Sequence, residues 1–291
     1  MASPALVALV PLLPEFLLVR RRSVDFIQRS MDRHGVDRPA LMLVIGRELT
    51  GDWHTLDETR SPYATTSEPQ LAAAEAARGA KLVTEWLGRW ALTDQGRRLC
   101  ADLRTAAHAA LAKLEPVPAA ELAELAELLE RGFEANATAP EPARRDYLPR
   151  TLRFRGGVAA AHPLVALENA VHGLWAERDD CHVAAWRAAG LDGPAHDALT
   201  RIWRGEAATR EALRERLTGQ RPADFAASVA RLQDAGLVAG DATLTLTGEG
   251  KRVREAIEAE TDRLFFTWWP EEVAARGPWL RETLAKVNAA L

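Results

Sequence analysis

The sequence predicts a mainly α-helical protein with small β-hairpins, an α+β fold built from two similar domains in tandem. Two observations carry this prediction. The stretch ALTDQGRRLCADL, which starts at Ala91, has a close counterpart 154 residues later in TLTGEGKRVREAI. A second pair, HGVDRPALMLVIGREL and AGLDGPAHDALTRIWRG, aligns Pro39 with Pro194 at a spacing of 155. Two collinear matches at nearly equal spacing indicate a duplicated domain.

The bulk properties fit two soluble domains. A chain of 291 residues suits two domains of about 150 residues each. The net charge of −4 gives no overall attraction to nucleic acid or to an anionic membrane, so a polyanion would have to meet a local basic patch. Cys100 and Cys181 form no C-x-x-C pair, which favours reduced cysteines and a cytoplasmic location over a disulfide framework.

Residues 1–22 form an apolar N-terminal segment. No positive charge precedes the apolar run, Pro11 and Pro14 interrupt it, and three arginines at 20–22 follow it. A signal peptide carries its charge first, and a membrane span needs about 20 apolar residues. We therefore expect a packed helical segment, placed at a dimer interface, and no membrane partner.

The second copy predicts four helices, a hairpin and a long helix. Pro194 and Pro222 open helices, Thr209 caps one, and Gly190 and Gly236 end two others. Leu244 and Leu246 alternate with polar residues after a turn at 240–241, as in a hairpin. The helices are expected at 181–189, 194–204, 208–217 and 222–236, the hairpin at 237–246, and the long helix, capped by Thr247, from there to Phe266.

The first copy predicts the same order with a looser middle at 54–63. Helices are expected at 39–48, 67–79, 94–114 and 119–135, with a hairpin around Gly88. Residues 136–160 are rich in proline, glycine and arginine and predict a linker. The predicted organisation is an N-terminal segment at 1–22, a first domain at 23–135, a linker at 136–160 and a second domain at 161–291.

Three helices, a hairpin and a long helix are the order of a winged helix, in which the helix before the hairpin reads DNA. The run from Ala91 to Gly132 resembles the end of proteins of the MarR family, in which Leu-Thr-x-x-Gly starts a long helix. The second half resembles actinobacterial tandem winged-helix proteins. This resemblance implies that two winged-helix domains of one chain form an intrachain pseudo-dimer in place of a MarR homodimer.

Duplex DNA is the partner that this fold favours. The charges of the candidate recognition helices support DNA binding only in part. The candidate recognition helices, 67–79 and 222–236, each carry two acidic residues against one arginine. Acidic side chains that face a duplex weaken binding. The candidate DNA-binding residues are Gln70, Arg78, Arg89, Arg210, Arg214, Arg216, Arg221 and Arg231. For each arginine the alternative is a solvated helix face.

Aromatic residues suggest a pocket for a small-molecule effector. Aromatic walls with a few polar groups are typical of ligand pockets, although tryptophan at helical spacing also occurs in cores. A MarR-like dimer binds its effector between the dimerisation helices and the DNA-binding lobe, as the resemblance implies. The candidate ligand-binding residues are Trp53, His54, His172, Trp175, Trp186 and Trp203.

The region 162–182 is the most polar cluster. Glu168 and His172 share a helix face, a geometry that can hold a metal. The chain has no H-E-x-x-H, no C-x-x-C and no nucleophile elbow, so we predict no metal, no cofactor and no confident catalytic residue. The resembled tandem proteins carry a similar Arg-x-Asp-x-His stretch, which selects Arg178, Asp180 and His182 for an alternative chemical site.

Three functions remain open from the sequence. The leading one is a MarR-like regulator that binds duplex DNA under the control of a small aromatic ligand, not an enzyme, acting as a single-chain pseudo-dimer or as a homodimer. The alternative is a winged-helix scaffold without DNA binding that binds or transforms a small molecule, as in natural-product biosynthesis or resistance. A third is an oligomerisation module that uses the leucine-rich helix near 122–129.

Overall fold

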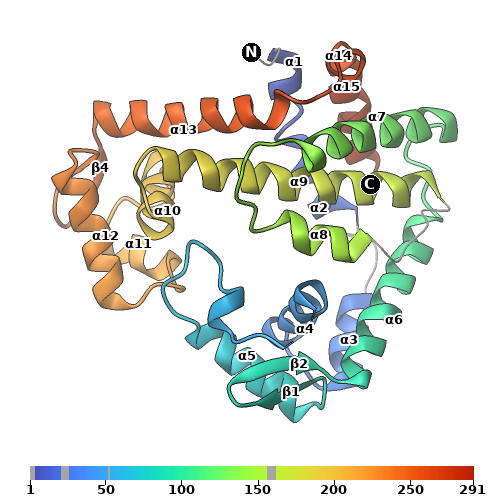
Figure 1. The fold of residues 1–291 in the computed structure, drawn as a ribbon, viewed down its shortest axis with the longest axis horizontal. Helices are drawn as coiled ribbons and strands as arrows, with labels where there is room; N and C mark the ends of the chain where they lie inside the picture. The colour runs from blue at the N-terminus through green and yellow to red at the C-terminus, as the bar shows by residue number, and fades with distance from the viewer. Residues whose placement is uncertain (1–3, 21–25, 52, 156–161) are drawn as a thin grey trace. The chain divides into compact units, whose positions relative to one another are not determined.

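The computed structural model describes residues 4–20, 26–51, 53–155 and 162–291. Arg21, Arg22 and residues 156–160, parts of the predicted basic run and linker, lie outside this description. The protein is mainly helical with two antiparallel sheets of two strands each in the described part, as the α+β prediction requires (Figure 1).

The chain divides into two compact units. Unit 1 comprises Met1–Trp53, Ala74–Cys181 and Asp262–Leu291, and unit 2 comprises His54–Ala73 and His182–Thr261. The division falls within three helices, α5 (Glu68–Gly79), α9 (Pro163–Ala188) and α13 (Gly248–Phe266). The remaining helices of unit 1 are α1 (Pro4–Val7), α2 (Leu12–Val19), α3 (Phe26–His34), α4 (Arg38–Thr50), α6 (Asp94–Leu111), α7 (Ala119–Thr138), α8 (Leu148–Arg155), α14 (Glu271–Ala274) and α15 (Gly277–Ala290).

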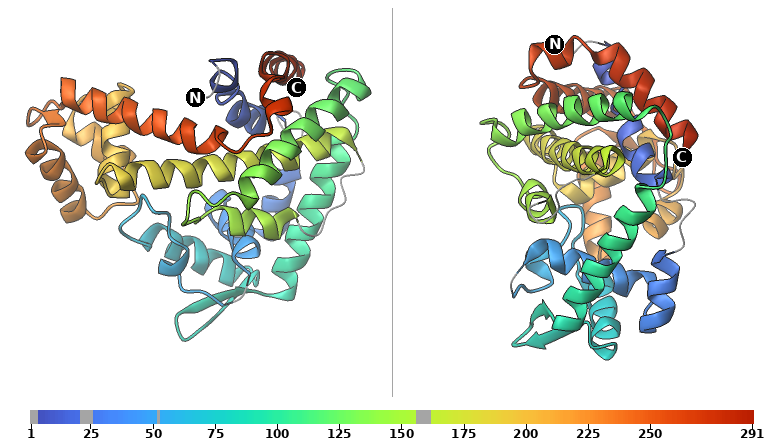
Figure 2. Two further views of the ribbon diagram at one scale, coloured as in Figure 1. Left: turned by 45° about the horizontal axis from the view of Figure 1, so that its top comes forward. Right: turned by 90° about the vertical axis from the view of Figure 1, so that its right-hand side faces the viewer.

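The N-terminal segment is part of the core of unit 1. Helices α1 and α2 pack against α15 near the C-terminus (Figure 2). Leu9, Leu13 and Phe16 are fully buried, and the Asn288 side chain donates a hydrogen bond to the carbonyl of Leu12 at 3.0 Å. In the part of the chain that the structure describes, no helix is long and apolar enough to cross a membrane.

Helix α7 buries the leucines that suggested an oligomerisation module. Leu122, Leu125 and Leu129 are at most 2% exposed within the single chain. A Cβ on Gly132 would meet the Trp269 ring at 3.1 Å, so any larger residue would require the ring to shift by a few tenths of an ångström. These side chains stabilise unit 1 and are not available to a partner.

The segment predicted as a linker contains ordered structure. Helix α7 extends to Thr138, and α8 occupies Leu148–Arg155. The Arg145 guanidinium donates hydrogen bonds to the carbonyls of Asn136 and Ala139 at 2.9 and 2.7 Å, and to the Glu177 carboxylate at 3.2 Å. A charged side chain with several acceptors fixes its segment, because each bond would be lost if the segment moved away.

The two hairpins have the same connection to the helix that follows. In unit 1, β1 (Val83–Trp86) pairs with β2 (Arg89–Leu92), and in unit 2, β3 (Val238–Ala239) pairs with β4 (Thr245–Leu246). The hydroxyl of Thr93 contacts the carbonyls of Lys81 and Leu82 and accepts from the Gly96 N–H at 3.1 Å.

Thr247 repeats this arrangement at the start of α13. Its hydroxyl contacts the carbonyls of Gly236 and Leu237 and accepts from the Gly250 N–H at 2.9 Å. Both threonines therefore act as N-caps, as the sequence predicts for Thr247, and both also fix the hairpin to the cap.

Helices α4 and α10 (Gly193–Trp203) also begin alike. Asp37 accepts from the Ala40 N–H at 2.9 Å, and Asp192 accepts from the Ala195 N–H at 2.8 Å. Each helix has a proline in its first turn, where the missing N–H costs no intrahelical bond.

Candidate nucleic-acid interface

The centre of unit 2 is a pair of short helices joined by a tight turn. Helix α11 (Arg210–Arg216) is followed by the turn 217–221 and by α12 (Pro222–Asp234). Leu213 of α11 and Phe225, Val229 and Leu232 of α12 are buried in one apolar cluster, which also holds α10 and the β3–β4 hairpin. Packing of one face of each helix on this cluster leaves the opposite face of α12 exposed.

The sequence determines where these helices start. Thr209 accepts a hydrogen bond from the Ala212 N–H at 3.1 Å, so it is the predicted N-cap of α11. Helix α12 begins at Pro222, as predicted, because proline suits the first turn. The cap residue of α12, Arg221, makes no side-chain cap of its own.

The exposed face of α12 is short of groups that could read bases. Its exposed residues include four alanines, at 223, 226, 227 and 230, together with Arg231 and Asp234. Alanine can contact a thymine methyl group but makes no hydrogen bond to a base edge. This face can therefore approach a groove closely while offering little direct sequence discrimination.

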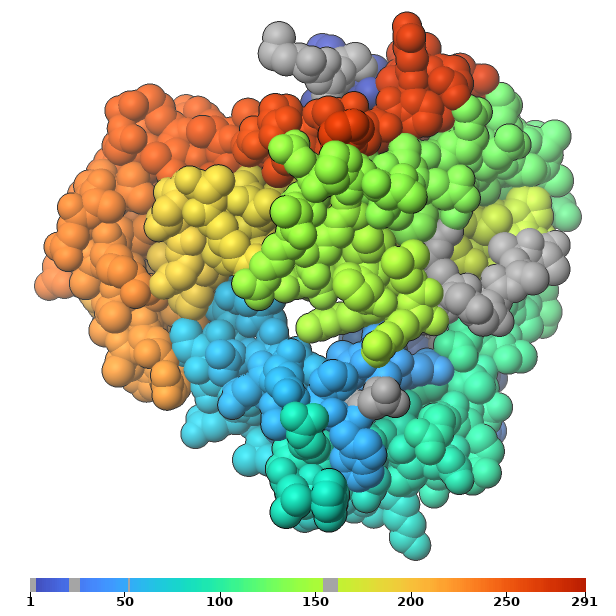
Figure 3. All heavy atoms as spheres, in the orientation of Figure 1, coloured from blue at the N-terminus to red at the C-terminus, as the bar shows by residue number. Residues whose placement is uncertain are grey.

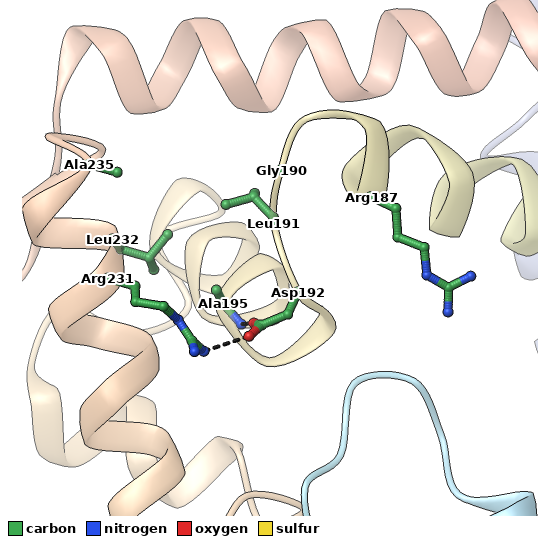
Figure 4. Close-up of a pocket in the computed structure, with 8 residues that line it drawn as sticks. All are labelled: Arg187, Gly190, Leu191, Asp192, Ala195, Arg231, Leu232 and Ala235. Carbon is green, nitrogen blue, oxygen red and sulfur yellow. Dashed lines mark hydrogen bonds and ion pairs between the residues drawn. The ribbon is translucent and has the colours of Figure 1, made fainter.

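Three of the candidate arginines of unit 2 form ion pairs close to α12. Arg210 pairs with Asp241 at 3.3 Å, Arg221 with Asp224 at 2.6 Å, and Arg231 with Asp192 at 2.5 Å. The Arg231–Asp192 pair lies in a depression of about 400 Å³ that Leu191 and Leu232 also line (Figure 4). In each pair the carboxylate offsets the positive charge that the arginine presents to a phosphate.

Arg214 and Arg216 differ from these three. Both are exposed on α11, and neither forms an ion pair with a residue in the described ranges. They are the arginines of unit 2 best placed to contact a phosphate without breaking an existing contact.

A helix-turn-helix family model matches residues 72–291, about three quarters of the chain, including α11, the turn and α12. The chain belongs to this helix-turn-helix family. Searches of curated proteins and of solved structures found no match.

The DNA-binding candidates of this helix-turn-helix protein that precede residue 90 are mostly engaged with neighbouring residues. Arg78 pairs with Glu75 at 2.6 Å and lies over the Trp90 ring at 5.9 Å, while Arg89 donates to the Trp53 carbonyl at 2.8 Å. Gln70 is half-buried.

The aromatic candidates are distributed over both units and have different neighbours. In unit 1, Trp53 lies edge-on to Trp86 at 6.5 Å, His172 contacts Arg20 at 3.0 Å, and Trp175 is half-buried. In unit 2, His54 lies 3.8 Å from Glu58, Trp186 is buried, and Trp203 is exposed at the surface.

A cavity of about 660 Å³ lies beside the first hairpin in unit 1. Trp53 lines it together with Arg47, Arg97 and Arg104. Arg104 pairs with Glu48 at 3.1 Å and Arg97 with Asp94 at 2.8 Å, so the lining combines two ion pairs with one aromatic ring.

The three residues of the alternative chemical site each have a different partner. Arg178 donates to Asp262 at 3.0 Å, and His182 contacts the Thr261 hydroxyl at 3.0 Å. Asp180 accepts three backbone N–H groups, from Asp146, Tyr147 and Leu148, at 2.6, 2.9 and 2.8 Å. These contacts hold segments of the chain together, because the guanidinium, the carboxylate and the ring nitrogen each already contact a group on another segment.

Glu168, which with His172 suggested a metal pair, is fully buried and forms an ion pair with Arg20. Among the described residues, no group of three or more histidine, cysteine, aspartate or glutamate side chains could hold a metal ion.

Unit 2 contains a buried polar network that the sequence analysis did not predict. Arg254 is 1% exposed, lies over the Trp203 ring at 4.8 Å and donates to the Thr200 hydroxyl at 3.0 Å. His196 is 3% exposed and stacks on Trp186, with ring centroids 5.9 Å apart. Burial, with His182 and Arg254 adding positive charge nearby, lowers the pKa of His196 to about 2.

Proposed function

We propose that this helix-turn-helix protein is a MarR-like winged-helix transcriptional regulator that binds duplex DNA, with α12 of unit 2 entering the major groove. The exposed face of α12, with Arg214 and Arg216 exposed on α11, is the observation that carries the proposal. In helix-turn-helix proteins the second helix lies in the groove while the first contacts the backbone. Two exposed arginines on α11, the first helix, are suited to contact the DNA backbone.

The equivalent junctions support a tandem arrangement. Thr93 and Thr247 make matching hydrogen bonds at a spacing of 154, and Asp37 and Asp192 cap matching helices at a spacing of 155. On this proposal a winged-helix domain at 23–135 and another at 161–291 form an intrachain pseudo-dimer, with 1–22 as the N-terminal segment and 136–160 as the linker. Such a chain can act as a monomer or as a homodimer, and a regulator of this kind acts in the cytoplasm.

Phosphate contacts rather than base contacts should dominate the binding. The helices and turn from Arg210 to Asp234 carry five arginines against four acidic residues, a net charge of +1, so attraction to the duplex is modest. With four alanines on the exposed face of α12, discrimination comes from thymine methyl contacts and from DNA shape.

The cavity in unit 1 is the place we propose for a small aromatic effector. Trp53 offers an aromatic wall, and the lining carries Arg47, Arg97 and Arg104 against Glu48 and Asp94, a net charge of +1 that favours an acidic group. The alternative of a scaffold that transforms a small molecule has less support, because Arg178, Asp180 and His182 each hold a neighbouring segment.

The test of DNA binding is a titration of random duplex DNA at several salt concentrations. Wild-type protein should bind at low salt and lose affinity linearly on a log–log plot. The double variant Arg214→Ala/Arg216→Ala should bind more weakly, with a slope smaller by about 2, one for each phosphate contact removed.

The matched control is Arg281→Ala, which removes an exposed arginine from α15 in unit 1. It should leave both the affinity and the slope close to wild type. Absence of salt-dependent binding by the wild-type protein would remove duplex DNA from the function. Equal losses in the control and the double variant would remove α11 from the interface.

A further inference from the structure

A segment of the chain lies on the turn between α11 and α12. The backbone N–H groups of Thr65 and Thr66 donate to the carbonyl of Gly219 at 2.8 and 3.1 Å. A Cβ on Gly219 would lie 3.0 Å from the Cβ of Ala64, so the two backbones are in close contact. We call residues 54–73, the first stretch of unit 2, the covering segment (Figure 3).

Thr65 supplies the cap that α12 lacks. Its hydroxyl oxygen accepts a hydrogen bond from the Arg221 N–H at 3.0 Å. The same hydroxyl donates to the Asp224 carboxylate, and the pKa of Asp224 is lowered by its hydrogen bond to Arg221 and then by the one from Thr65. A phosphate at the N-terminus of a helix accepts hydrogen bonds from backbone N–H groups. Here the Thr65 hydroxyl oxygen is the acceptor at the start of α12.

The covering segment is held by packing as well as by hydrogen bonds. The Trp186 indole N–H donates to the Tyr63 hydroxyl at 3.4 Å, and the Tyr63 ring lies 6.0 Å from both Trp186 and His196. A Cβ on Gly193 would come within 2.0 Å of the Pro62 carbonyl oxygen, so only glycine allows this approach.

The charge of the covering segment opposes that of a DNA-binding surface. It carries Asp57, Glu58 and Glu68 against Arg60, a net charge of −2 with His54 neutral. The pKa of Arg221 is raised first by its hydrogen bond and ion pair with Asp224, and also by Glu68 and Asp57 of the covering segment. Acidic groups therefore already surround the basic start of α12.

We propose that the covering segment is an internal competitor of DNA, so that the helix-turn-helix binds a duplex only after residues 62–66 leave the turn. This inference rests on the proposed function, because it concerns the same surface. The Arg221 N–H cannot serve the Thr65 hydroxyl and a phosphate oxygen together, and the acidic residues repel the duplex. The measured affinity is then the intrinsic affinity reduced by the fraction of molecules in which the turn is uncovered.

A reversible cross-link tests the proposal without removing any native contact. The double variant Ala64→Cys/Gly219→Cys places two Cβ atoms 3.0 Å apart, somewhat closer than the ~3.8 Å usual in a disulfide. The native Cys100 and Cys181 do not interfere, because both are buried and burial raises the pKa of each thiol to about 12.

The oxidised form, with the covering segment fixed on the turn, should bind random duplex DNA at least about tenfold more weakly than the reduced form of the same protein. If oxidised and reduced forms bind DNA equally, the competition is refuted while DNA binding stands. If neither form nor the wild type binds at low salt, the proposed function itself falls. Failure of the folded protein to cross-link would contradict the contact.

A second variant weakens the covering segment. Thr65→Val with Asp57→Asn and Glu68→Gln removes the cap and two negative charges, and should raise DNA affinity about tenfold. The control, Glu127→Gln/Glu134→Gln, removes two negative charges from exposed positions on α7 of unit 1. An equal rise in the control would assign the effect to net charge alone and overturn the role of the covering segment.

Discussion

Thr93 and Thr247 occupy equivalent positions in the two hairpin-to-helix junctions. Each hydroxyl contacts two carbonyls at the start of its hairpin and accepts from a glycine N–H three residues later. Two of the residues whose carbonyls accept these bonds also have matching backbone angles, since φ is 61° at Lys81 and 69° at Gly236. The repeated sequence motif thus encodes a repeated local structure, in which the glycine is as important as the threonine.

Replacement of Gly250 by alanine should destabilise unit 2. A Cβ there would come within 2.0 Å of the Leu237 carbonyl oxygen, which is backbone and cannot move without distorting the hairpin. We expect a loss of about 1–3 kcal/mol, as for other overpacked sites, measured by denaturant unfolding followed by circular dichroism. The control is Gly248→Ala in the same helix turn, where a Cβ meets nothing within 4 Å. That variant should be as stable as wild type or more so, and the reverse order would contradict the contact.

Acid should destabilise unit 2 through His196. Folding keeps this imidazole neutral down to a pKa of about 2, whereas an unfolded chain takes up the proton near 6.5. The unfolded state therefore binds more protons below pH 6.5, and stability falls as the pH drops, by about 1.4 kcal/mol per pH unit for this group.

The variant His196→Phe keeps a ring against Trp186 and removes the titration. Its melting temperature, followed by intrinsic tryptophan fluorescence, should vary less between pH 6.5 and 4.5 than that of the wild type. His54→Gln, in the same unit, is the control and should keep the wild-type slope. Equal slopes in all three proteins would show that His196 does not titrate between the two states.

Unit 1 should respond to pH in the opposite direction through Glu177. Burial raises the pKa of this carboxyl to about 7, although Arg145 lies beside it and favours the charged form. The folded state then holds a proton that the unfolded state releases near 4.5, so stability falls as the pH rises from about 4.5 to 7. The contribution is at most about 3 kcal/mol.

Glu177→Gln should flatten this part of the stability profile, measured by denaturant unfolding at several pH values. Glu134→Gln, exposed on α7, should leave the profile unchanged. A profile for Glu177→Gln that still falls by the wild-type amount would assign the slope to other groups.

Asp180 should be essential for the order of the segment before α8. It is fully buried and accepts three consecutive backbone N–H groups there. In Asp180→Asn an amide N–H₂ faces donors, so we expect a loss of about 2–4 kcal/mol and faster proteolysis between residues 139 and 148. Asp179→Asn is the matched control, because Asp179 accepts no hydrogen bond from the segment in the described structure. Equal protease sensitivity of the two variants would contradict the role of Asp180.

Local signals explain which parts of the fold could be predicted. Thr209, Pro222 and Thr247 act through hydrogen bonds or φ preferences within a few residues, so the sequence shows where their helices start. The Arg20–Glu168 ion pair joins residues 148 positions apart, and no periodicity reveals it. The same holds for Thr65, whose ordinary loop sequence gives no sign that it caps a helix more than 150 residues away.

The candidate site was predicted less well than the fold, for a related reason. The sign of a charge can be read from the sequence. However, an arginine that pairs with an aspartate presents less positive charge to a phosphate than an arginine without a carboxylate beside it. Arg210, Arg221 and Arg231 form ion pairs, whereas the exposed Arg214 and Arg216 form none with a described residue, and only the structure separates them.

The discontinuous path of the chain through unit 2 limits how the protein can be dissected. A fragment that starts at residue 161 would contain α10–α13 but would lack Tyr63, which packs on Trp186 and His196. No single proteolytic nick or genetic crossover can excise this unit intact, because its two stretches enclose residues 74–181 of the other. Unit 2 can therefore be produced intact only from a chain that supplies both of its stretches, residues 54–73 and 182–261.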